Sequence, residues 1–306
     1  MRAGFRLVTY EVSDGLPQAG VLLGDRVHAA ADILGGRPTV LDLLDDWQVT
    51  RARLADWASG EADARSGSAL DGVRLLAPIQ YPANFFCAGA NYWDHLEEMA
   101  ELITRMTGSA PRTEKAAEPW FYVRTTRGTI VGDRHHVRLP TFSTQVDWEA
   151  ELGVVIGTET REINEADALS AVAAYTIVND LSARDHVKRE GSPFIYDWVG
   201  QKCWDGSAPM GPWLTPAHLV ADPHDLAITL TVNGVVKQSS NTGRMVHSIA
   251  EQVAYLSRHV TLFPGDVIAT GTPAGVGMPR GEFLKNGDEV RVEITGLGTL
   301  TTTMVA

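Results

Sequence analysis

The sequence DWEAELGVVI, at residues 147–156, decides the fold and the chemistry that we expect of this chain. Its apolar second half predicts a buried β-strand, in which successive side chains point to opposite faces. Glu149 and Glu151 therefore lie on the same face of that strand. Two buried carboxylates repel each other and lose their hydration, which costs several kcal/mol per ion in protein interiors. A divalent cation bound between them would remove both penalties.

The strand alone leaves other environments open for these two carboxylates. Their face could be exposed to solvent, or arginine and lysine partners could neutralise it. Asp180 adds a third acid at the end of the β-rich run 174–179, where strand-end side chains often point into a site. Three carboxylates with no histidine or cysteine nearby favour Mg²⁺, Mn²⁺ or Ca²⁺ over Zn²⁺. Three protein ligands also leave positions for water and substrate, which is typical of a catalytic centre.

Short predicted strands surround this segment and dominate the chain after Trp120. Asn233-Gly234 predicts a type I′ turn between two of them. Because the strands do not alternate regularly with helices, a doubly wound parallel sheet is not expected. The sequence predicts an α+β, mostly β fold, a mixed β-sandwich or roll. We expect strands at 121–124, 149–156, 173–178, 226–232, 235–238, 267–270, 289–294 and 299–304, with helices at 91–106 and 245–259.

The chain divides into two predicted domains. Residues 1–72 read as a small α/β domain, and residues 73–306 as the catalytic domain. The first contains expected strands at 6–12 and 20–29, helices at 39–47 and 49–59, and a linker at 60–71. In the second, the region 96–119 reads as helix followed by a polar loop, and we expect it to act as a lid.

The composition excludes several classes of function. A net charge of −12 argues against nucleic-acid binding, because phosphate contacts need clustered Lys and Arg. It also means that an anionic substrate needs local positive charge or a metal. No apolar run reaches the roughly 18–20 residues that span a bilayer, and the N-terminus lacks the apolar stretch of a signal peptide. The two cysteines form no disulfide framework, so a reducing cytoplasm is the expected location.

Several motifs, in order over residues 73–304, resemble those of the fumarylacetoacetate hydrolase family. They are Asn91-Tyr92-x-x-His95-x-x-Glu98, Glu149-x-Glu151, Asn179-Asp180-x-Ser182-Ala183-Arg184-Asp185, Gly200-Gln201-Lys202 and Gly271-Thr272-Pro273-x-Gly275-x-Gly277. The resemblance implies a mixed β roll with a small N-terminal domain, a homodimer, and a role in the catabolism of aromatic compounds. It also implies that Glu149, Glu151 and Asp180 bind the metal and that Lys202 is the active-site lysine.

Two positions depart from the family pattern. Val187 stands where members commonly have glutamine, and Arg124 replaces a lysine that often follows the Phe-rich strand. Both changes are expected to alter polar contacts near the substrate or its entrance.

Other residues have a functional and a structural interpretation. His95 and Glu98, three apart on a helix, are an exposed pair or a dyad in which Glu98 orients a basic His95; the surrounding motif favours the dyad. Lys202 stabilises an oxyanion, or is a surface lysine with its apolar stem buried. Arg184 binds a substrate carboxylate or pairs with Asp185. Tyr92 and Thr272 are candidate substrate contacts.

Two further patterns are weaker. The glycine-rich loop 271–277 lacks a following helix, so a carboxylate-binding loop is favoured over a nucleotide fingerprint. His135 and His136 lie in the charged segment 133–138, which reads as a solvated loop rather than a metal site. No Gly-x-Ser-x-Gly elbow supports a serine hydrolase.

The predicted function is hydrolysis of a C–C bond in a small, anionic 1,3-diketo acid of the acylpyruvate or fumarylpyruvate type, with Mg²⁺, Mn²⁺ or Ca²⁺. Decarboxylation of an oxaloacetate-type acid and isomerisation of a hydroxymuconate-type acid remain alternatives, because each proceeds through a similar enolate. A non-catalytic metal-binding or ligand-binding protein is the rival of a different class.

Overall fold

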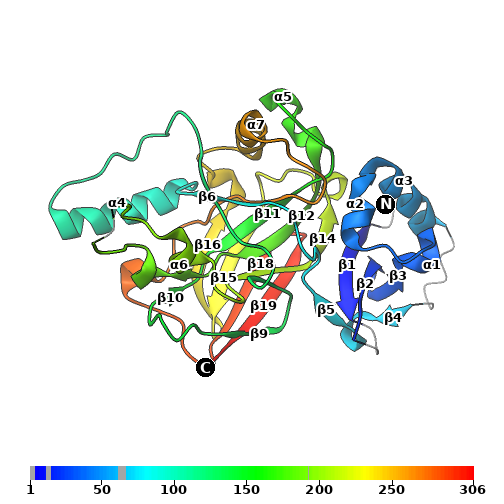
Figure 1. Ribbon diagram of the computed structural model, residues 1–306, viewed down its shortest axis with the longest axis horizontal. Coiled ribbons are helices and arrows are strands. Elements are labelled where there is room, and N and C mark those ends of the chain that lie inside the picture. Colours follow the sequence, from blue (N-terminus) through cyan, green and yellow to red (C-terminus); the bar gives the residue numbers. More distant parts are fainter. Residues whose placement is uncertain (1–3, 12–14, 61–66, 192) are drawn as a thin grey trace.

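The computed structural model describes residues 4–11, 15–60, 67–191 and 193–306, and its main body is built on a long mixed sheet (Figure 1). In the described residues the order runs β4-β3-β2-β1-β14-β12-β11-β17-β6-β7, with β5 beside β1 and β8 beside β14. The bounds are β1 Phe5–Glu11, β2 Pro17–Leu23, β3 Arg26–Ala29, β4 Ser68–Ala69, β5 Arg74–Leu76, β6 Phe85–Gly89, β7 Trp120–Val123, β8 Ile130–Val131, β11 Ala150–Ile156, β12 Val172–Asn179, β14 Ala208–Pro216 and β17 Val267–Ala269.

A second sheet packs against the first. Its order is β16-β15-β18-β19-β9, and a short pair, β10 with β13, lies apart. Leu152 of β11, Leu230 of β15 and Leu300 of β19 belong to one buried core between the two sheets. This confirms the predicted mixed, mostly β fold. The bounds are β9 His135–Arg138, β10 Val146–Asp147, β13 Ser182–Ala183, β15 Ala227–Val232, β16 Val235–Asn241, β18 Glu289–Ile294 and β19 Gly298–Val305.

Burial along the strands follows the sequence pattern. Every residue of β11 is buried, as its apolar run predicts, whereas β18 alternates exposed and buried residues. Asn233 and Gly234 both have positive φ, 52° and 76°, as the predicted type I′ turn requires.

The N-terminal unit continues the large sheet. Leu7 of β1 pairs with Leu214 of β14, and β5 pairs with β1 across the predicted boundary. Leu7 and Leu44 also share a buried core with Val155 of β11. The division at residue 72 stays a prediction, while this sheet pairing and shared core join the two parts.

Several expected elements were wrong. The single strand predicted at 20–29 is the hairpin of β2 and β3, turning at Gly24, whose φ is 62°. The loop predicted at 133–138 contains β9, an edge strand that buries Val137 and leaves its charged residues toward solvent. The central strand β14 was not among the predicted strands, because prolines are rare inside a sheet; its pairing with β12 shifts register between Tyr175 and Ile177, at the place of Pro212.

Helices cover parts of both sheets. The predicted helices at 39–47 and 49–59 are α2 and α3, and the one at 245–259 begins only at Ile249. The bounds are α1 Ala30–Leu34, α2 Val40–Asp45, α3 Trp47–Ser59, α4 Trp93–Thr107, α5 Glu165–Ala168, α6 Trp198–Lys202 and α7 Ile249–His259, with 3₁₀ turns η1 Leu70–Gly72, η2 Leu169–Ala171, η3 Arg184–His186, η4 Ala217–Leu219, η5 Thr242–Arg244 and η6 Met278–Arg280. No helix of the described residues is long and apolar enough to cross a membrane.

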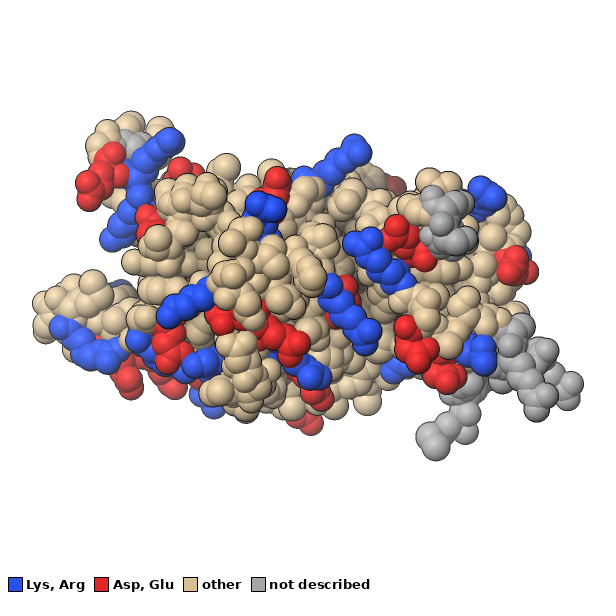
Figure 2. All heavy atoms as spheres, turned by 90° about the horizontal axis from the view of Figure 1, so that it is seen from below, with Lys and Arg blue, Asp and Glu red and all other residues tan. Residues whose placement is uncertain are grey.

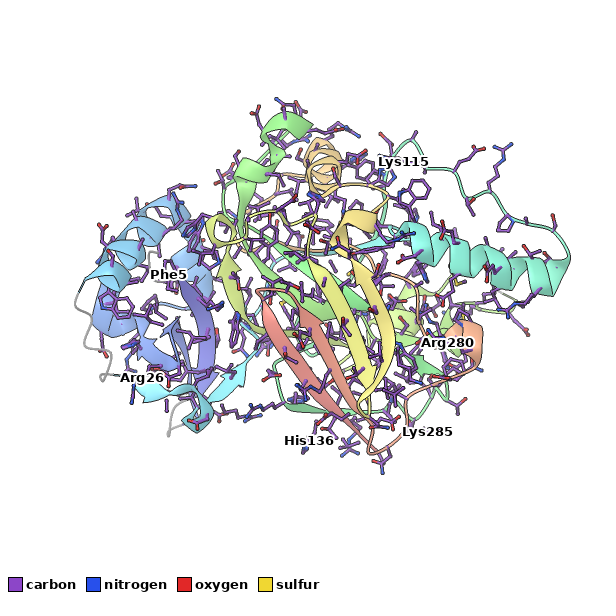
Figure 3. The ribbon with its side chains drawn as sticks, turned by 180° about the vertical axis from the view of Figure 1, so that it is seen from behind. Phe5, Arg26, Lys115, His136, Arg280 and Lys285 are labelled. Carbon is purple, nitrogen blue, oxygen red and sulfur yellow. The ribbon has the colours of Figure 1, made fainter. Side chains whose placement is uncertain are left out.

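Helix α4 projects from the body, and residues 108–119 return from its end to β7 (Figure 1). No residue of α4, which is described throughout, is buried. The returning segment is tied to α7 by Lys115–Glu251 at 2.5 Å and Glu118–Arg258 at 2.9 Å, and Figure 3 labels Lys115 there. Its function as a lid stays a prediction.

Charges are mixed on the face drawn in Figure 2, where basic and acidic side chains alternate without a broad basic patch. The expectation that the chain does not bind nucleic acid stays a prediction.

Candidate metal centre

The three predicted carboxylates come together where β11 begins and β12 ends. These strands are antiparallel neighbours, with Ala150 opposite Asn179, so Glu149 and Asp180 flank the same sheet end as Glu151. The Asp180 amide donates a hydrogen bond to the Glu149 carbonyl at 2.9 Å. One oxygen from each of Glu149, Glu151 and Asp180 lies within 4.8 Å of the others, and all three side chains are buried.

Backbone amides and two amide side chains fix this arrangement. The Glu149 amide donates to Asn179 Oδ1 at 3.1 Å, and the Gly271 amide donates to Glu151 Oε2 at 2.8 Å. Buried Gln238 accepts from the Ala150 amide at 2.9 Å. These bonds hold the backbone at Glu149 and Ala150 and the side chain of Glu151.

The electrostatics fit a divalent cation. Burial, with the charges of Asp180 and Glu149, raises the pKa of Glu151 well above its usual range. Burial would also raise the pKa of Asp180, but Arg124 and Lys202 outweigh it and lower that pKa. The charge of Lys202 and the hydrogen bond from the Gly271 amide lower the pKa of Glu151, but they do not offset the burial and the repulsion. A buried all-oxygen donor set of this kind could hold a divalent metal ion.

Cationic side chains lie in the same cluster. Lys202 Nζ lies 2.8 Å from Glu149 Oε2 and 2.6 Å from Asp180 Oδ2, and Arg184 Nη2 lies 2.6 Å from Glu149 Oε1. Basic partners thus neutralise Glu149 and Asp180 in part, as the alternative interpretation of these carboxylates expected. The surface interpretation of Lys202 is wrong, because its side chain is only 4% exposed. Its predicted part in oxyanion stabilisation stays a prediction.

Arg124 was expected to alter polar contacts near the substrate or its entrance; the structure buries it, so it does not lie at an exposed entrance, and its nearness to substrate stays a prediction. Arg124 is fully buried beneath Asp180, to which it donates a hydrogen bond. It also donates to the Lys202 carbonyl, to Ser207 Oγ at 2.6 Å and to the Leu181 carbonyl at 3.1 Å. These neutral and charged acceptors make it a structural support of the centre.

Two other residues of the centre were missed by sequence reasoning. Tyr122 donates its hydroxyl to Asp180, and Asp147 is buried with no exposed surface. The period of two would have found both, because Tyr122 precedes Arg124 by two residues and Asp147 precedes Glu149 by two.

Arg184 does not make the pairing with Asp185 that was one of its two interpretations. Its Nε donates to Asp147 Oδ2 at 2.9 Å, in addition to the ion pair with Glu149. Asp185 instead accepts from the Ser143 hydroxyl and from the Thr144 amide. Contact of Arg184 with substrate stays a prediction.

His95 and Glu98 face each other on the first turns of α4. His95 Nδ1 lies 3.6 Å from Glu98 Oε2, beyond hydrogen-bond length, and has no hydrogen-bond partner among the described residues. Glu98 accepts from the Gly275 amide at 3.1 and 3.0 Å. The two side chains are close enough for the predicted dyad, because catalytic hydrogen bonds are often long before substrate binds; their role as a dyad stays a prediction.

One loop supports both the carboxylates and the dyad. The amides of Gly271, Gly275 and Gly277 donate to Glu151, Glu98 and Asp147 respectively. Gly275 has a φ of 106°, and a Cβ there would lie 2.2 Å from the Lys237 carbonyl, so only glycine fits. The loop therefore sets the distance between the dyad and the metal ligands.

The two candidate substrate contacts are buried near this loop. Thr272 Oγ1 accepts from Gln238 Nε2 at 2.8 Å. The Tyr92 hydroxyl has no hydrogen-bond partner in the described part of the chain, and burial followed by the charge of Glu151 raises its pKa well above the usual range. Their contact with substrate stays a prediction.

Replacing Glu98 with glutamine is expected to destabilise the protein in a pH-dependent way. Burial alone would raise the pKa of Glu98, but contacts with His95 and the Gly275 amide lower it below its usual range. A lowered pKa stabilises the fold above the unfolded value of about 4.3, and this contribution is lost as the pH falls through the folded value. Urea unfolding at several pH values should show a gap between the two proteins that narrows only below about pH 4.3. A gap that is the same at pH 7 and pH 3.5 would contradict this prediction.

Comparison with known proteins gives a consistent assignment. Residues 84–305 match the sequence family described as "Fumarylacetoacetate (FAA) hydrolase C-terminal". The chain is 42% identical over 230 residues to the human protein named "Oxaloacetate tautomerase FAHD2B, mitochondrial", an alignment that covers 74% of this chain and 68% of that one.

Two solved structures share the whole fold. A 2-hydroxyhepta-2,4-diene-1,7-dioate isomerase from Mycobacterium marinum is 30% identical with a TM-score of 0.71, covering 98% of both chains. A maleylpyruvate hydrolase from Sphingobium sp. SYK-6, solved with manganese(II) and pyruvate, is 26% identical with a TM-score of 0.77, again covering 98% of both.

Proposed function

This chain is an enzyme of the fumarylacetoacetate hydrolase family, and on that premise we propose that it interconverts the keto and enol forms of a small 2-oxo dicarboxylic acid of the oxaloacetate type. Support comes from the tautomerase names of relatives about 40% identical, and from the isomerase among the similar structures. The observation that carries the proposal is the buried carboxylate cluster beside a histidine–glutamate pair.

Glu149, Glu151 and Asp180 would hold a divalent cation in this function. When bound, the cation supplies Lewis-acid stabilisation of the negative charge that develops on the oxygen of a 2-oxo acid. We propose Mg²⁺ or Mn²⁺, with Ca²⁺ as the third candidate, on the oxygen donor set and on the manganese recorded in a similar structure.

The protein's own groups perform the proton transfer in this proposal. From keto to enol, His95 takes the proton from the carbon next to the carbonyl and delivers it to the enolate oxygen, and in the other direction it takes the enol proton and delivers it to that carbon. Between the two transfers Glu98 stabilises the charged imidazole, while Gly275 holds Glu98 in place. Lys202 and Arg184 supply positive charge for the carboxylates of the substrate. The net charge of −12 makes this local positive charge necessary for an anionic substrate.

Hydrolysis of a C–C bond in an acylpyruvate or fumarylpyruvate is the second candidate. The same His95–Glu98 pair, 3.6 Å apart, could instead remove a proton from water that attacks the distal carbonyl. The similar maleylpyruvate hydrolase supports this candidate. We further propose a homodimer, as for the family.

Product analysis distinguishes these reactions. Purified protein with Mn²⁺ would be mixed with the enol form of oxaloacetate, and separately with an acylpyruvate. The proposal expects accelerated loss of the enol absorbance, with no CO₂ released and with mass preserved. Two acids formed from an acylpyruvate would support the hydrolase instead, and rapid CO₂ release would support a decarboxylase.

Replacing His95 with alanine is expected to lower turnover by about 100- to 10,000-fold, which is the range for losing a general base. Metal affinity should remain unchanged, because His95 contacts none of the three carboxylates among the contacts of the described residues. Steady-state kinetics and calorimetric titration with Mn²⁺ measure the two effects separately. His136→Ala, on the exposed face of β9, is the matched control and should retain full activity. Turnover of His95→Ala equal to wild type would remove the dyad from the mechanism.

A further inference from the structure

Lys202 shares its acceptor atoms with the expected cation. Each of the four oxygens of Glu149 and Asp180 already faces a cation: Arg184 at Glu149 Oε1, Lys202 at Glu149 Oε2, Arg124 at Asp180 Oδ1 and Lys202 at Asp180 Oδ2. Lys202 is the cation, among the described residues, that reaches both carboxylates. A divalent ion that takes an oxygen from each must therefore compete with its ammonium.

The three cationic side chains differ in how many other acceptors they bind besides Glu149 and Asp180. Arg124 has further acceptors at Leu181 and Ser207, and Arg184 has Asp147. Among the described residues, Lys202 Nζ has the Asp180 carbonyl, at 3.4 Å, as its one hydrogen-bond acceptor besides the two carboxylates, and it lies 5.4 Å from the centre of the Tyr122 ring. It stands at the last position of the short helix α6, on a flexible stem of four carbons. Among the three, Lys202 is thus the group that can leave.

Charge supplies the reason for it to leave. When ionised, Glu149, Glu151, Asp180 and the Arg184-paired Asp147 carry four negative charges against three positive ones from Lys202, Arg124 and Arg184, so a bound divalent ion restores the balance only if Lys202 leaves. An ammonium and a divalent ion on the same oxygens repel strongly where water is excluded. An anionic substrate offers the displaced ammonium a new partner.

We propose that Lys202 is a resident counter-ion that a divalent cation displaces from Glu149 and Asp180, and that its ammonium then binds the carboxylate of the substrate. The inference rests on the metal centre of the proposed function. It implies that the cation and an anionic substrate strengthen each other's binding. The cation frees the ammonium that binds the substrate, and the substrate gives the displaced ammonium a partner. In the absence of substrate, the metal should bind more weakly than it would to the three carboxylates without Lys202.

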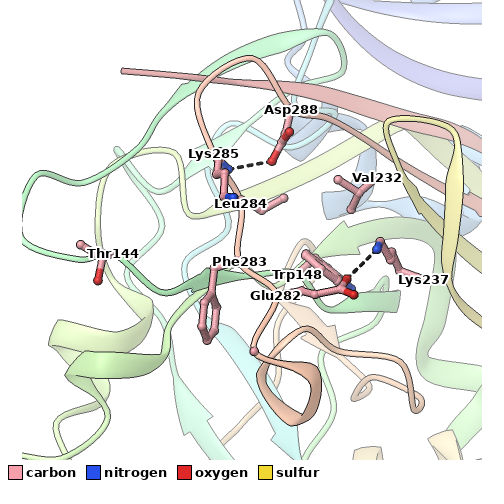
Figure 4. A pocket seen from close by; sticks show the side chains of 10 residues that line it. Thr144, Trp148, Val232, Lys237, Glu282, Phe283, Leu284, Lys285 and Asp288 are labelled. Carbon is pink, nitrogen blue, oxygen red and sulfur yellow. Dashed lines mark hydrogen bonds and ion pairs between the residues drawn. The ribbon is translucent and has the colours of Figure 1, made fainter.

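Calorimetric titration of Lys202→Met with Mn²⁺ tests this directly. We expect the variant to bind Mn²⁺ about tenfold more tightly than wild type, within the usual range of coupling between two sites. Lys237→Met is the matched control. Lys237 forms its ion pair, at 2.5 Å, with Glu282 in the cavity of Figure 4, and not with the three carboxylates. It should bind Mn²⁺ like wild type. Affinity of Lys202→Met equal to or weaker than wild type would overturn the proposal.

Thermal unfolding provides a second measurement that does not depend on one variant folding well. Lys202→Met and Lys202→Gln both remove the counter-ion that Glu149 and Asp180 share and leave each carboxylate one arginine, so both should gain more in melting temperature on adding Mn²⁺ than wild type does. Oxalate, used as an anionic probe, should tighten Mn²⁺ binding by a smaller factor in both variants. Equal gains in all three proteins would overturn the role of Lys202 while leaving the metal centre intact. Failure of wild type itself to bind Mn²⁺ would overturn the centre and the inference together.

Discussion

Replacing Glu151 with glutamine is expected to abolish metal binding while making the metal-free protein more stable at neutral pH. Glutamine keeps the shape and can still accept from the Gly271 amide, but it removes one of the three charges. Mn²⁺ affinity should fall by more than about 100-fold, beyond the 10–100-fold typical of losing an outer hydrogen bond at a metal site. Turnover should be lost with it.

The gain in stability follows from the pKa of Glu151, which burial and the neighbouring carboxylates raise well above its usual range. A group with a raised folded pKa stabilises the fold fully below its unfolded value of about 4.3, and that contribution is lost as the pH rises through the folded value. At pH 7 the raised pKa of Glu151 therefore destabilises the metal-free protein, and glutamine, which does not titrate, removes this cost.

Urea unfolding and calorimetry measure the two effects of this substitution. Glu282→Gln is the matched control, because Glu282 is 43% exposed and pairs with Lys237. It should leave Mn²⁺ binding unchanged. A Glu151→Gln protein that binds Mn²⁺ as wild type does would exclude Glu151 as a ligand.

Replacing Arg124 with methionine is expected to destabilise the protein by about 3–5 kcal/mol, the usual cost of leaving one partner of a buried ion pair alone. Arg124 is fully buried and donates to Asp180, to two backbone carbonyls and to Ser207. The substitution leaves these acceptors without their donor and takes one of two cationic partners from Asp180.

Urea unfolding of the metal-free protein measures the expected loss. Arg127→Met, three residues further along and exposed, should change the free energy of unfolding by less than about 0.5 kcal/mol. Adding Mn²⁺ should recover part of the loss in Arg124→Met, because the cation replaces the missing positive charge at Asp180. A change as small as that of the control would mean that Arg124 is not needed to compensate Asp180.

Local patterns were sufficient to predict the main parts of the centre. The apolar run of residues 152–156 indicated a buried strand, and a period of two put Glu149 and Glu151 on one face; both predictions agree with the structure. The hairpin at Asn233-Gly234 and the strand at 289–294 likewise follow from turn chemistry and alternation.

Parts that depend on long-range packing could not be predicted. Arg124 lies 56 residues before Asp180. The two meet because the fold places the end of β7 next to the carboxylate cluster. The prolines of β14 argue against a central strand, and the register shift that makes room in the sheet is seen only in the pairing of β14 with β12. The support of Glu98 by Gly275, 177 residues away, also needs the folded loop. Such contacts leave no periodic signal in the sequence.

The central claim is that Glu149, Glu151 and Asp180 form one divalent-metal centre. An anomalous difference map from crystals grown with Mn²⁺ tests it most directly. The account predicts one strong peak in each chain, within coordination distance of an oxygen from each of the three side chains. A map at saturating Mn²⁺ with no peak there, or with its strongest peak at other residues, would contradict it.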